Sequence, residues 1–545
     1  MFSRALSFQF DYANIPPMAH RLILFNGNLA TFDSSQPHAS AIVMRGDEIL
    51  YVGDDATAHT FRERNSETID LQKKLTLPAF TDAHLHFTGF AQTLENVNLE
   101  GCRSLEEAVE RVCARVGQTP RDVLIWGGGW NNAEWTDGAF PNKRALDAVA
   151  PNNPVILTRK DGHSIWLNSR ALENANITRE TISPEGGVID YDDEGEPSGI
   201  LRENAMELLG GGVGAFAFEI REETLLRAIQ YAHATGITTV HSIEGSNALR
   251  AFQKLRAQDK LTLRVVHTIP GEKIELAANI GIMRGFGDEW LKLQAIKIFA
   301  DGSLGSHTAE LREPFLDAPD NRGVTTTTSE TMYAQARQAC EAGLDVWIHA
   351  IGDYAITRVL DVFATLRAEG FHDAIFRVEH VQHLHPSDVN RFRELNVIAS
   401  MQPIHQPSDM FVADALLGRE RAAWTYAFKS LQDAGATLAF GSDAPVEKMD
   451  PLLGIYAAVT RQNAQGIPEN GWYPEQKISV LDAVRAYTLG AAKASGDETR
   501  AGSLTIGKRA DVIVLSQDIF EIPPRELLNT NVVYSISGGQ VVHSG

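Results

Sequence analysis

The sequence predicts an α/β protein: a (β/α)8 TIM barrel with a large inserted subdomain, accompanied by a small β domain. Three observations lead to this prediction. Eight short runs in the middle of the chain are almost entirely apolar, helical segments separate them, and both ends of the chain are rich in short β patterns. Apolar runs without alternation are typical of parallel strands that helices cover on both faces.

The two ends of the chain are expected to form one composite domain. Residues 19–78 contain short strand patterns separated by glycine turns, and residues 500–545 repeat that organisation. Two β-rich ends around a different middle indicate one small β domain built from both ends of the chain. Residues 1–18 are expected to be an N-terminal tail, since two consecutive prolines stand just before the strand patterns begin.

The barrel is expected to occupy residues 79–499. Its eight predicted strands are KLTLPAFTDAHLH, ITTVHS, LTLRVVHTI, LQAIKIFADG, LDVWIHAIG, IFRVEHVQ, VIASMQP and TLAFGSDAP. REETLLRAIQYAHATG precedes the second run and SETMYAQARQACEAG precedes the fifth. Both segments have helical patterning and end in glycine, which is a helix stop signal.

One interval is far longer than a barrel crossover needs, the one between His86 and Ile237. We therefore expect an inserted subdomain at about residues 88–225, placed over the active-site mouth. The insertion is rich in tryptophan, and Trp130 follows Gly127-Gly128-Gly129 directly. These tryptophans are expected to form a core, with an aromatic wall facing the mouth as the alternative.

Composition excludes several classes of function. The chain has 545 residues, 43% hydrophobic and 22% charged, which is typical of a globular protein. Its 70 acidic residues against 49 basic ones give a net charge of -21, which disfavours nucleic acid and anionic membranes as partners. Its 3 cysteines are too few for a disulfide framework and favour a cytoplasmic location, and no apolar run approaches the ~18 residues of a membrane span.

The pair His84 and His86 is the first candidate for a metal-binding site. Residues i and i+2 of a strand point to the same side, so both imidazoles face one point, as a metal site requires. Asp82 shares that face and could orient a ligand histidine from behind. The alternative is an ordinary group of polar residues at a strand end.

Four more candidates stand at the ends of other predicted strands: Lys297, His349, His380 and Asp443. In such barrels the catalytic groups collect at the C-terminal ends of the strands. Together with the histidine pair they form a plausible two-metal cluster, and imidazole with carboxylate suits Zn²⁺ or a similar divalent ion.

Lys297 requires its own explanation, because an ammonium group cannot bind a metal ion. A buried lysine with a lowered pKa can react with carbon dioxide and become an anionic carbamate that bridges two ions. The alternative is an ion pair with Asp301 or another carboxylate. His241, which ends the second strand, is a candidate for contact with substrate or with a ligand.

Ten motifs in order resemble the amidohydrolase superfamily, specifically the amidohydrolase 3 branch that includes N-substituted formamide deformylase. They are LPAFTDAHLHF, GGGWNNAEW, KDGHSIWLNSRAL, PEGGVIDYDDEGEPSGILREN, IKIFADGSLGSHTAEL, WIHAIGD, RVEHVQHL, SMQPIHQPSD, AFGSDAPVE and GSLTIGKRADVIVL. The resemblance extends from about Met18 to the end of the chain. It implies a (β/α)8 barrel with a β-sandwich built from both ends.

The resemblance also implies roles for the candidate residues. It places His84 and His86 on one ion, His349 and His380 on the other, and Lys297 between them as a carboxylated bridge. Asp443 would bind the first ion and carry the proton. Four residues are candidates for substrate binding: His163, Trp130, His241 and Gln402.

The expected function is hydrolysis of a non-peptide C–N bond, of the amide, N-substituted formamide or lactam type, in a small organic substrate. A metal-activated water would attack, and a homodimer is expected from the family. An esterase or a cyclic-amidine deaminase on the same metal site is the first alternative, because one metal constellation serves several bonds. A catalytically silent barrel used as a scaffold is the second.

Overall fold

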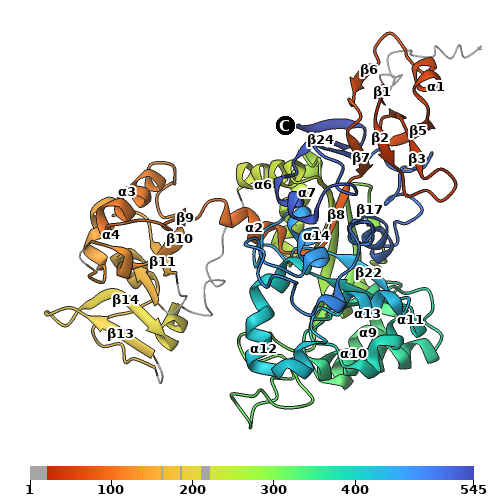
Figure 1. The fold of residues 1–545 in the computed structure, drawn as a ribbon. Coiled ribbons are helices and arrows are strands. Elements are labelled where there is room, and N and C mark those ends of the chain that lie inside the picture. The colour runs from red at the N-terminus through yellow and green to blue at the C-terminus, as the bar shows by residue number, and fades with distance from the viewer. Residues whose placement is uncertain (1–20, 137, 161–163, 185–186, 210–220) are drawn as a thin grey trace, which may run out of the picture. The chain divides into compact units, whose positions relative to one another are not determined.

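The structure is a computed structural model in which the described parts of the chain fold into two compact units (Figure 1). The described residues are 21–136, 138–160, 164–184, 187–209 and 221–545. One unit comprises the chain up to Phe90 together with Leu225–Gly545, and the other is Ala91–Thr224. The expected tail at residues 1–18 and the candidate His163 lie outside the described residues.

Eight parallel strands form the barrel of the first unit, in the order in which they occur along the chain. They are β8 (Phe80–Leu85), β15 (Ile237–Ser242), β16 (Arg264–Pro270), β18 (Leu291–Phe299), β19 (Asp345–Ala350), β20 (Phe376–His380), β21 (Val397–Met401) and β22 (Thr437–Phe440). Two backbone hydrogen bonds join the carboxyl end of β8 to the segment that follows β22, from Asp443 N to His84 O at 2.7 Å and from His86 N to Ala444 O at 2.8 Å. The predicted (β/α)8 fold is confirmed, with a barrel that is nearly closed.

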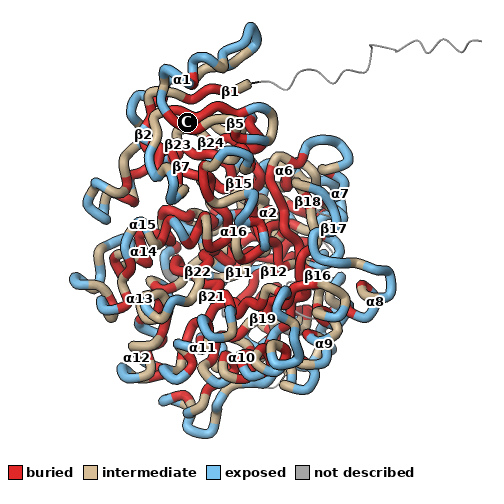
Figure 2. Tube along the Cα trace, turned by 90° about the vertical axis from the view of Figure 1, so that its right-hand side faces the viewer, coloured by how far each residue is buried: buried red, intermediate tan, exposed pale blue. Residues whose placement is uncertain are grey.

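Helices follow the strands and form the outer layer of the barrel. They are α2 (Phe87–Thr93), α6 (Glu222–Ala234), α7 (Ser246–Ala257), α8 (Ile274–Asn279), α9 (Ser329–Glu341), α10 (Asp353–Ala368), α11 (Val389–Glu394), α12 (Gln406–Ala422), α13 (Phe428–Asp433), α14 (Pro451–Thr460), α15 (Val480–Arg485) and α16 (Ala491–Ala494). The two helices predicted from sequence are α6 and α9. The chain leaves them through Gly236 at φ 82° and Gly343 at φ 76°, left-handed values that glycine adopts without strain. Figure 2 shows buried backbone concentrated in the barrel strands and exposed segments among helices α8 to α13.

Both ends of the chain build the smaller β domain of the same unit. One sheet has the order β5-β4-β1-β6 and the other β25-β24-β23-β7-β2-β3. The strands are β1 (Arg21–Phe25), β2 (Asn28–Ala30), β3 (His38–Ala39), β4 (Ala41–Arg45), β5 (Glu48–Gly53), β6 (Glu67–Asp70), β7 (Leu75–Pro78), β23 (Val512–Leu515), β24 (Val532–Ser537) and β25 (Gln540–Ser544), and the short helix α1 (Asp55–Thr60) follows β5. Leu77 of β7 pairs with Ile513 of β23, so strands from opposite ends of the sequence are neighbours. The shared core contains Leu24, Ile42 and Val512.

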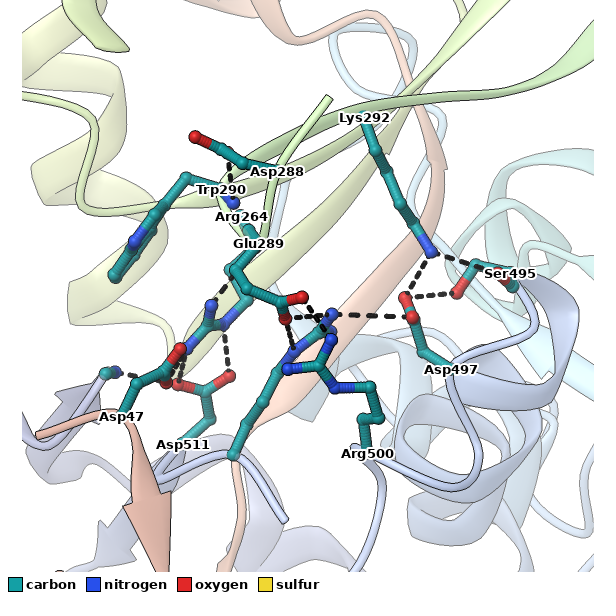
Figure 3. Close-up of polar contacts among 12 residues, drawn as sticks. Asp47, Arg264, Asp288, Glu289, Trp290, Lys292, Ser495, Asp497, Arg500 and Asp511 are labelled. Atoms are coloured by element: carbon teal, nitrogen blue, oxygen red, sulfur yellow. Dashed lines mark hydrogen bonds and ion pairs between the residues drawn. The ribbon is translucent and has the colours of Figure 1, made fainter. Parts of the chain in front are cut away.

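An ion-pair network connects the β domain to the barrel (Figure 3). The buried guanidinium of Arg264, at the start of β16, lies 2.7 Å from the Asp511 carboxylate and also contacts Asp47. At the start of β18, Lys292 Nζ lies 2.8 Å from Asp497 Oδ2. These charges lie at the amino ends of the strands, opposite to the rim where the candidate ligands were expected.

The insertion forms the second unit around one six-stranded sheet of order β13-β14-β12-β11-β10-β9. Its elements are β9 (Val97–Asn98), α3 (Leu105–Val116), β10 (Ile125–Trp130), α4 (Lys143–Val149), β11 (Val155–Arg159), β12 (Ser164–Leu167), α5 (Ser169–Asn174), β13 (Gly187–Tyr191) and β14 (Pro197–Glu203). Trp130, Trp135 and Trp166 are buried together in its core, and Trp130 Nε1 donates a hydrogen bond to Leu157 O at 2.9 Å. Trp130 therefore packs the insertion, and its expected contact with substrate stays a prediction.

None of the helices in the described parts of the chain combines the length and the apolar composition that crossing a membrane requires.

Candidate metal centre

Six candidate ligands come from five barrel strands and meet at the carboxyl end of the barrel. Their positions are His84 in β8, His86 directly after it, Lys297 in β18, His349 in β19, His380 at the end of β20, and Asp443 after β22. All five strands run in parallel, so their carboxyl ends lie at one rim. Burial lowers the pKa of His84, His349 and His380, and the Lys297 charge lowers the pKa of each further.

His84, His86 and Asp443 form the tightest group. Each offers one possible ligand atom, and these atoms lie within 4.8 Å of one another. Oδ1 of Asp443 lies 3.6 Å from His84 Nε2 and 3.4 Å from His86 Nε2. Burial raises the pKa of Asp443, but the neighbouring imidazoles of His86, His84 and His380 outweigh that effect and hold the pKa well below its usual range. An ionised carboxylate between two imidazole nitrogens is a suitable set of ligands for a divalent cation.

His349 and His380 lie beside this group, and their hydrogen bonds require opposite tautomers. The ring of His380 lies 4.5 Å from that of His349 and 4.7 Å from that of His84, centroid to centroid. His349 Nε2 donates to Gly302 O at 2.9 Å, which leaves Nδ1 as the nitrogen with a lone pair. His380 Nδ1 donates to Gln402 Oε1 at 2.8 Å, which leaves Nε2.

Burial keeps these two imidazoles in the neutral form that binds a metal ion. It lowers the pKa of His349 to about 3, with a further contribution from the Lys297 charge, and it lowers the pKa of His380 strongly. Gln402, an expected substrate-binding residue, orients His380 in this structure. Whether Gln402 also contacts substrate stays a prediction.

The Lys297 amine is buried, and its Nζ has no hydrogen-bond partner among the described residues. Burial lowers its pKa to about 7, although the Glu379 and Asp443 charges oppose this shift. Asp301, the partner expected for an ordinary ion pair, instead accepts backbone N–H groups of Glu310 at 2.9 Å, Ile351 at 3.0 Å and Gly352 at 2.8 Å. Among the described residues, the lysine nitrogen thus has no hydrogen bond and lies 4.0 Å from the centroid of the Phe299 ring.

Two of the candidate ligands have unusual backbone conformations. His380 has φ 74° and Asp443 has φ 55°, in the left-handed region that residues with a side chain seldom adopt. In both cases the chain turns sharply at the end of a strand and directs the side chain to the barrel rim. Strain of this kind concentrates at functional sites, where the surrounding structure holds it in place.

Sequence reasoning missed Glu379. Its Oε2 lies 2.6 Å from His84 Nδ1, whereas Asp82, the expected partner of the ring, accepts the backbone N–H groups of His84 at 3.2 Å and Ser442 at 3.0 Å. A signal was present in FRVEH, where Arg377 and Glu379 alternate within an otherwise apolar strand. Two charged residues at i and i+2 of a buried strand must share one face and pair there.

His241 lies inside the barrel with no exposed surface. Its Nδ1 accepts a hydrogen bond from Arg377 Nη1 at 2.9 Å, and its ring packs against Trp347 at 5.5 Å between centroids. Its role in substrate binding stays a prediction.

Comparison with known proteins identifies the family. The sequence pattern of the Amidohydrolase family matches residues 67–543. The chain is 35% identical to Protein LONG AFTER FAR-RED 3 of Arabidopsis thaliana over 539 residues, which covers 96% of this chain and 91% of the relative. The chain belongs to the amidohydrolase family.

Two other proteins support the assignment of this amidohydrolase. N-substituted formamide deformylase of Arthrobacter pascens is 26% identical over 541 residues, covering 95% of this chain and 97% of the relative. The crystal structure of an uncharacterized metal-dependent hydrolase from Pyrococcus furiosus is 31% identical with a TM-score of 0.78, covering 92% of this chain and 100% of that one. The predicted family and fold are therefore confirmed, and the family is one of metal-dependent hydrolases.

The residues present fit a divalent metal ion. Two buried atoms of the candidate ligands, Lys297 Nζ and Asp443 Oδ1, lack hydrogen-bond partners among the described residues. Buried polar atoms without partners are costly, and a bound cation satisfies a carboxylate oxygen directly. The imidazoles of His84, His86, His349 and His380 supply nitrogen donors. Together with the Asp443 carboxylate they form a set of nitrogen and oxygen donors that suits a divalent ion such as zinc.

Proposed function

We propose that this amidohydrolase hydrolyses a non-peptide C–N bond, of the amide, N-substituted formamide or lactam type, in a small organic substrate. The observation that carries the proposal is the convergence of the six side chains, with Asp443 held ionised between His84 and His86. The likeness to N-substituted formamide deformylase supports the choice of bond.

The proposal assigns the six residues to two ions. His84, His86 and Asp443 would hold one ion, and His349 and His380 would hold the other through the nitrogens that their hydrogen bonds leave free. Zn²⁺ is the metal that this donor set favours. When bound, such an ion polarises a substrate carbonyl and lowers the pKa of water toward neutrality.

Lys297 would bridge the two ions after carboxylation. Its neutral amine attacks the carbon of carbon dioxide, an N–C bond forms as one C=O π bond opens onto oxygen, and the nitrogen loses one proton to solvent, which converts a neutral amine into an anionic carbamate. The unsatisfied Nζ and its lowered pKa support this step, because only an unprotonated amine is nucleophilic.

Asp443 would carry the proton during hydrolysis. Its ionised carboxylate takes a proton from the attacking water and returns it to the leaving nitrogen, because an amine must be protonated before it can leave. The left-handed backbone at Asp443 holds the carboxylate at the rim, beside both imidazoles.

A metal analysis combined with one substitution tests the proposed function. The purified protein is expected to contain one or two divalent ions per chain and to hydrolyse a member of a panel of N-acyl amines, N-formyl amines and lactams. Asp443→Asn is expected to retain metal and to lower kcat by about 10²–10⁴-fold, the usual contribution of a general acid–base group.

Asp345→Asn is the matched control. It replaces another fully buried carboxylate, at the amino end of β19, and is expected to leave kcat within about twofold. A protein without metal contradicts the proposed function, and so does an Asp443→Asn enzyme with normal turnover. If the protein hydrolyses esters but none of the C–N substrates, the proposed bond is wrong and the protein is an esterase.

We further propose a homodimeric assembly and a cytoplasmic location. Cys102, Cys113 and Cys340 are all free thiols, as a reducing compartment allows. Light scattering of the purified protein and fractionation of cells test these two points.

A further inference from the structure

Arg377 and Glu379 place a pair of opposite charges inside the barrel. They are alternate residues of β20, so both side chains point to the same face of the strand, and neither side chain has exposed surface. The interior of such a barrel is usually filled by branched apolar side chains. A charged pair at this depth therefore requires a reason beyond filling space.

The guanidinium of Arg377 is fixed on all sides. Its Nη2 donates to Ala83 O at 2.6 Å and to Ser400 Oγ at 2.8 Å, and Nη1 donates to His241 Nδ1 at 2.9 Å. The group also lies over the Trp347 ring, with Cζ 3.7 Å from the centroid. These contacts from four other strands hold the guanidinium in one orientation.

Glu379 connects this fixed cation to the candidate metal centre. Oε1 of Glu379 lies 2.8 Å from Arg377 Nε, and Oε2 accepts from Arg377 Nη2 at 3.0 Å. The same Oε2 lies 2.6 Å from His84 Nδ1. An ionised carboxylate only accepts hydrogen bonds, so His84 must carry its proton on Nδ1 and keep its lone pair on Nε2, the nitrogen that faces Asp443.

We propose that Glu379 is a positioning residue that fixes the tautomer and the ring orientation of His84 for metal binding, and that Arg377 holds Glu379 in place. The inference rests on the proposed function, because it assigns His84 as a ligand. A carboxylate behind a ligand histidine raises the basicity of the imidazole and limits its rotation, and loss of such a partner weakens metal binding.

Metal affinity distinguishes this role from a purely structural one. Zinc affinity is measured by competition with a chromophoric chelator, and Co²⁺ absorption reports the ligand geometry. Glu379→Gln keeps an oxygen acceptor and is expected to weaken zinc binding about 10-fold, whereas Glu379→Leu removes the acceptor and is expected to weaken it toward 100-fold, with an altered Co²⁺ spectrum. Asp345→Asn, the buried carboxylate at the amino end of β19, serves as control with unchanged affinity and spectrum.

A double variant separates metal binding from folding. Glu379→Leu alone leaves the Arg377 charge buried without its partner and lowers stability. Arg377→Met/Glu379→Leu replaces the ion pair by apolar side chains, so the urea midpoint is expected to return close to that of the unsubstituted protein while zinc binding stays weak.

The other possible results distinguish failure of the positioning role from failure of the proposed function. If Glu379→Gln and the double variant both bind zinc as tightly as the unsubstituted protein, the positioning role is wrong and the proposed function stands. Failure of the double variant to fold, with or without zinc, also overturns the inference, because the barrel rather than the ion then needs the pair. If the unsubstituted protein binds no divalent ion, the proposed function itself fails.

Discussion

The Lys297 amine is the most informative single group in the structure. A buried nitrogen without a hydrogen bond loses its favourable free energy of hydration, and this loss is larger for the charged form than for the neutral form. This penalty lowers the pKa to about 7, so a substantial fraction of the amine is neutral at physiological pH. The same burial that disfavours the cation therefore prepares a nucleophile.

The proposed carboxylation of Lys297 can be tested by NMR. Protein equilibrated with ¹³C-labelled bicarbonate and zinc is expected to show one carbamate resonance in its ¹³C NMR spectrum, and Lys297→Met is expected to abolish it. Lys292→Met is the control, because Lys292 is also partly buried but is paired with Asp497 at 2.8 Å. A resonance that persists in Lys297→Met contradicts the assignment.

At the level of single residues, the sequence predicted the candidate ligands that follow from backbone geometry. It did not predict which side chains form hydrogen bonds with one another. Strand alternation identified the His84 and His86 pair, and the ends of the strands pointed to the other four candidates. The same rules indicated Asp82 as the partner of His84 and did not place Glu379, which lies on a strand far along the chain, near the ring. Distance in three dimensions identifies the partner, with Glu379 Oε2 at 2.6 Å from the ring.

At the scale of elements, the long patterned segments were predictable and the short ones were not. Each of the eight apolar runs contains a barrel strand, but the first run also contributes β7 to the β domain. Helices α6 and α9 lie within a few residues of their predicted bounds. The two-residue strand β17 (Phe286–Gly287) exists only because it pairs with β18, and α16 has four residues. Such pieces contain too few residues for a periodic signal, so tertiary contacts define them.

Helix α6 contains a buried histidine that links stability to pH. His233 has Nδ1 3.1 Å from Ile237 O and Nε2 3.0 Å from Thr262 Oγ1, and burial lowers its pKa to about 4. Because the folded pKa lies below the unfolded value of about 6.5, the unfolded chain binds more protons between these values. The contribution of His233 is therefore complete above about pH 6.5 and is lost as the pH falls toward 4.

The pH dependence of unfolding tests this contribution. Between pH 7.5 and pH 5.0 the linkage from His233 amounts to about 2 kcal/mol in the free energy of unfolding. His233→Gln, although less stable at pH 7.5, is expected to lose about that much less than the unsubstituted protein on acidification. His372→Gln alters an exposed histidine and is expected to behave like the unsubstituted protein. Equal losses in all three proteins contradict the assignment.

At the scale of the whole molecule, the network around Arg264 joins the β domain to the barrel (Figure 3). Arg264→Met leaves the Asp511 and Asp47 carboxylates without their buried cation, which is expected to reduce the free energy of unfolding by about 3–5 kcal/mol. Urea denaturation followed by circular dichroism measures this change.

An exposed ion pair of similar geometry supplies the comparison. Arg256 Nε lies 2.7 Å from Asp288 Oδ2, but the two side chains are 36% and 42% exposed to water. Arg256→Met is expected to change the free energy of unfolding by no more than about 1 kcal/mol, as for other surface pairs. If the two substitutions have equal effects, the Arg264 network does not stabilise the junction.

The pairing of β7 with β23 has a consequence for biosynthesis. The ribosome delivers Leu77 early and Ile513 only after more than four hundred further residues, so the edge of β7 stays open throughout that time. A nascent chain that stops before β23 would leave Leu77 and its neighbours accessible, a state that chaperones and proteases recognise. The edge of β7 is therefore covered only when the last strands have been synthesised, and a truncated chain is expected to be recognised by chaperones and proteases.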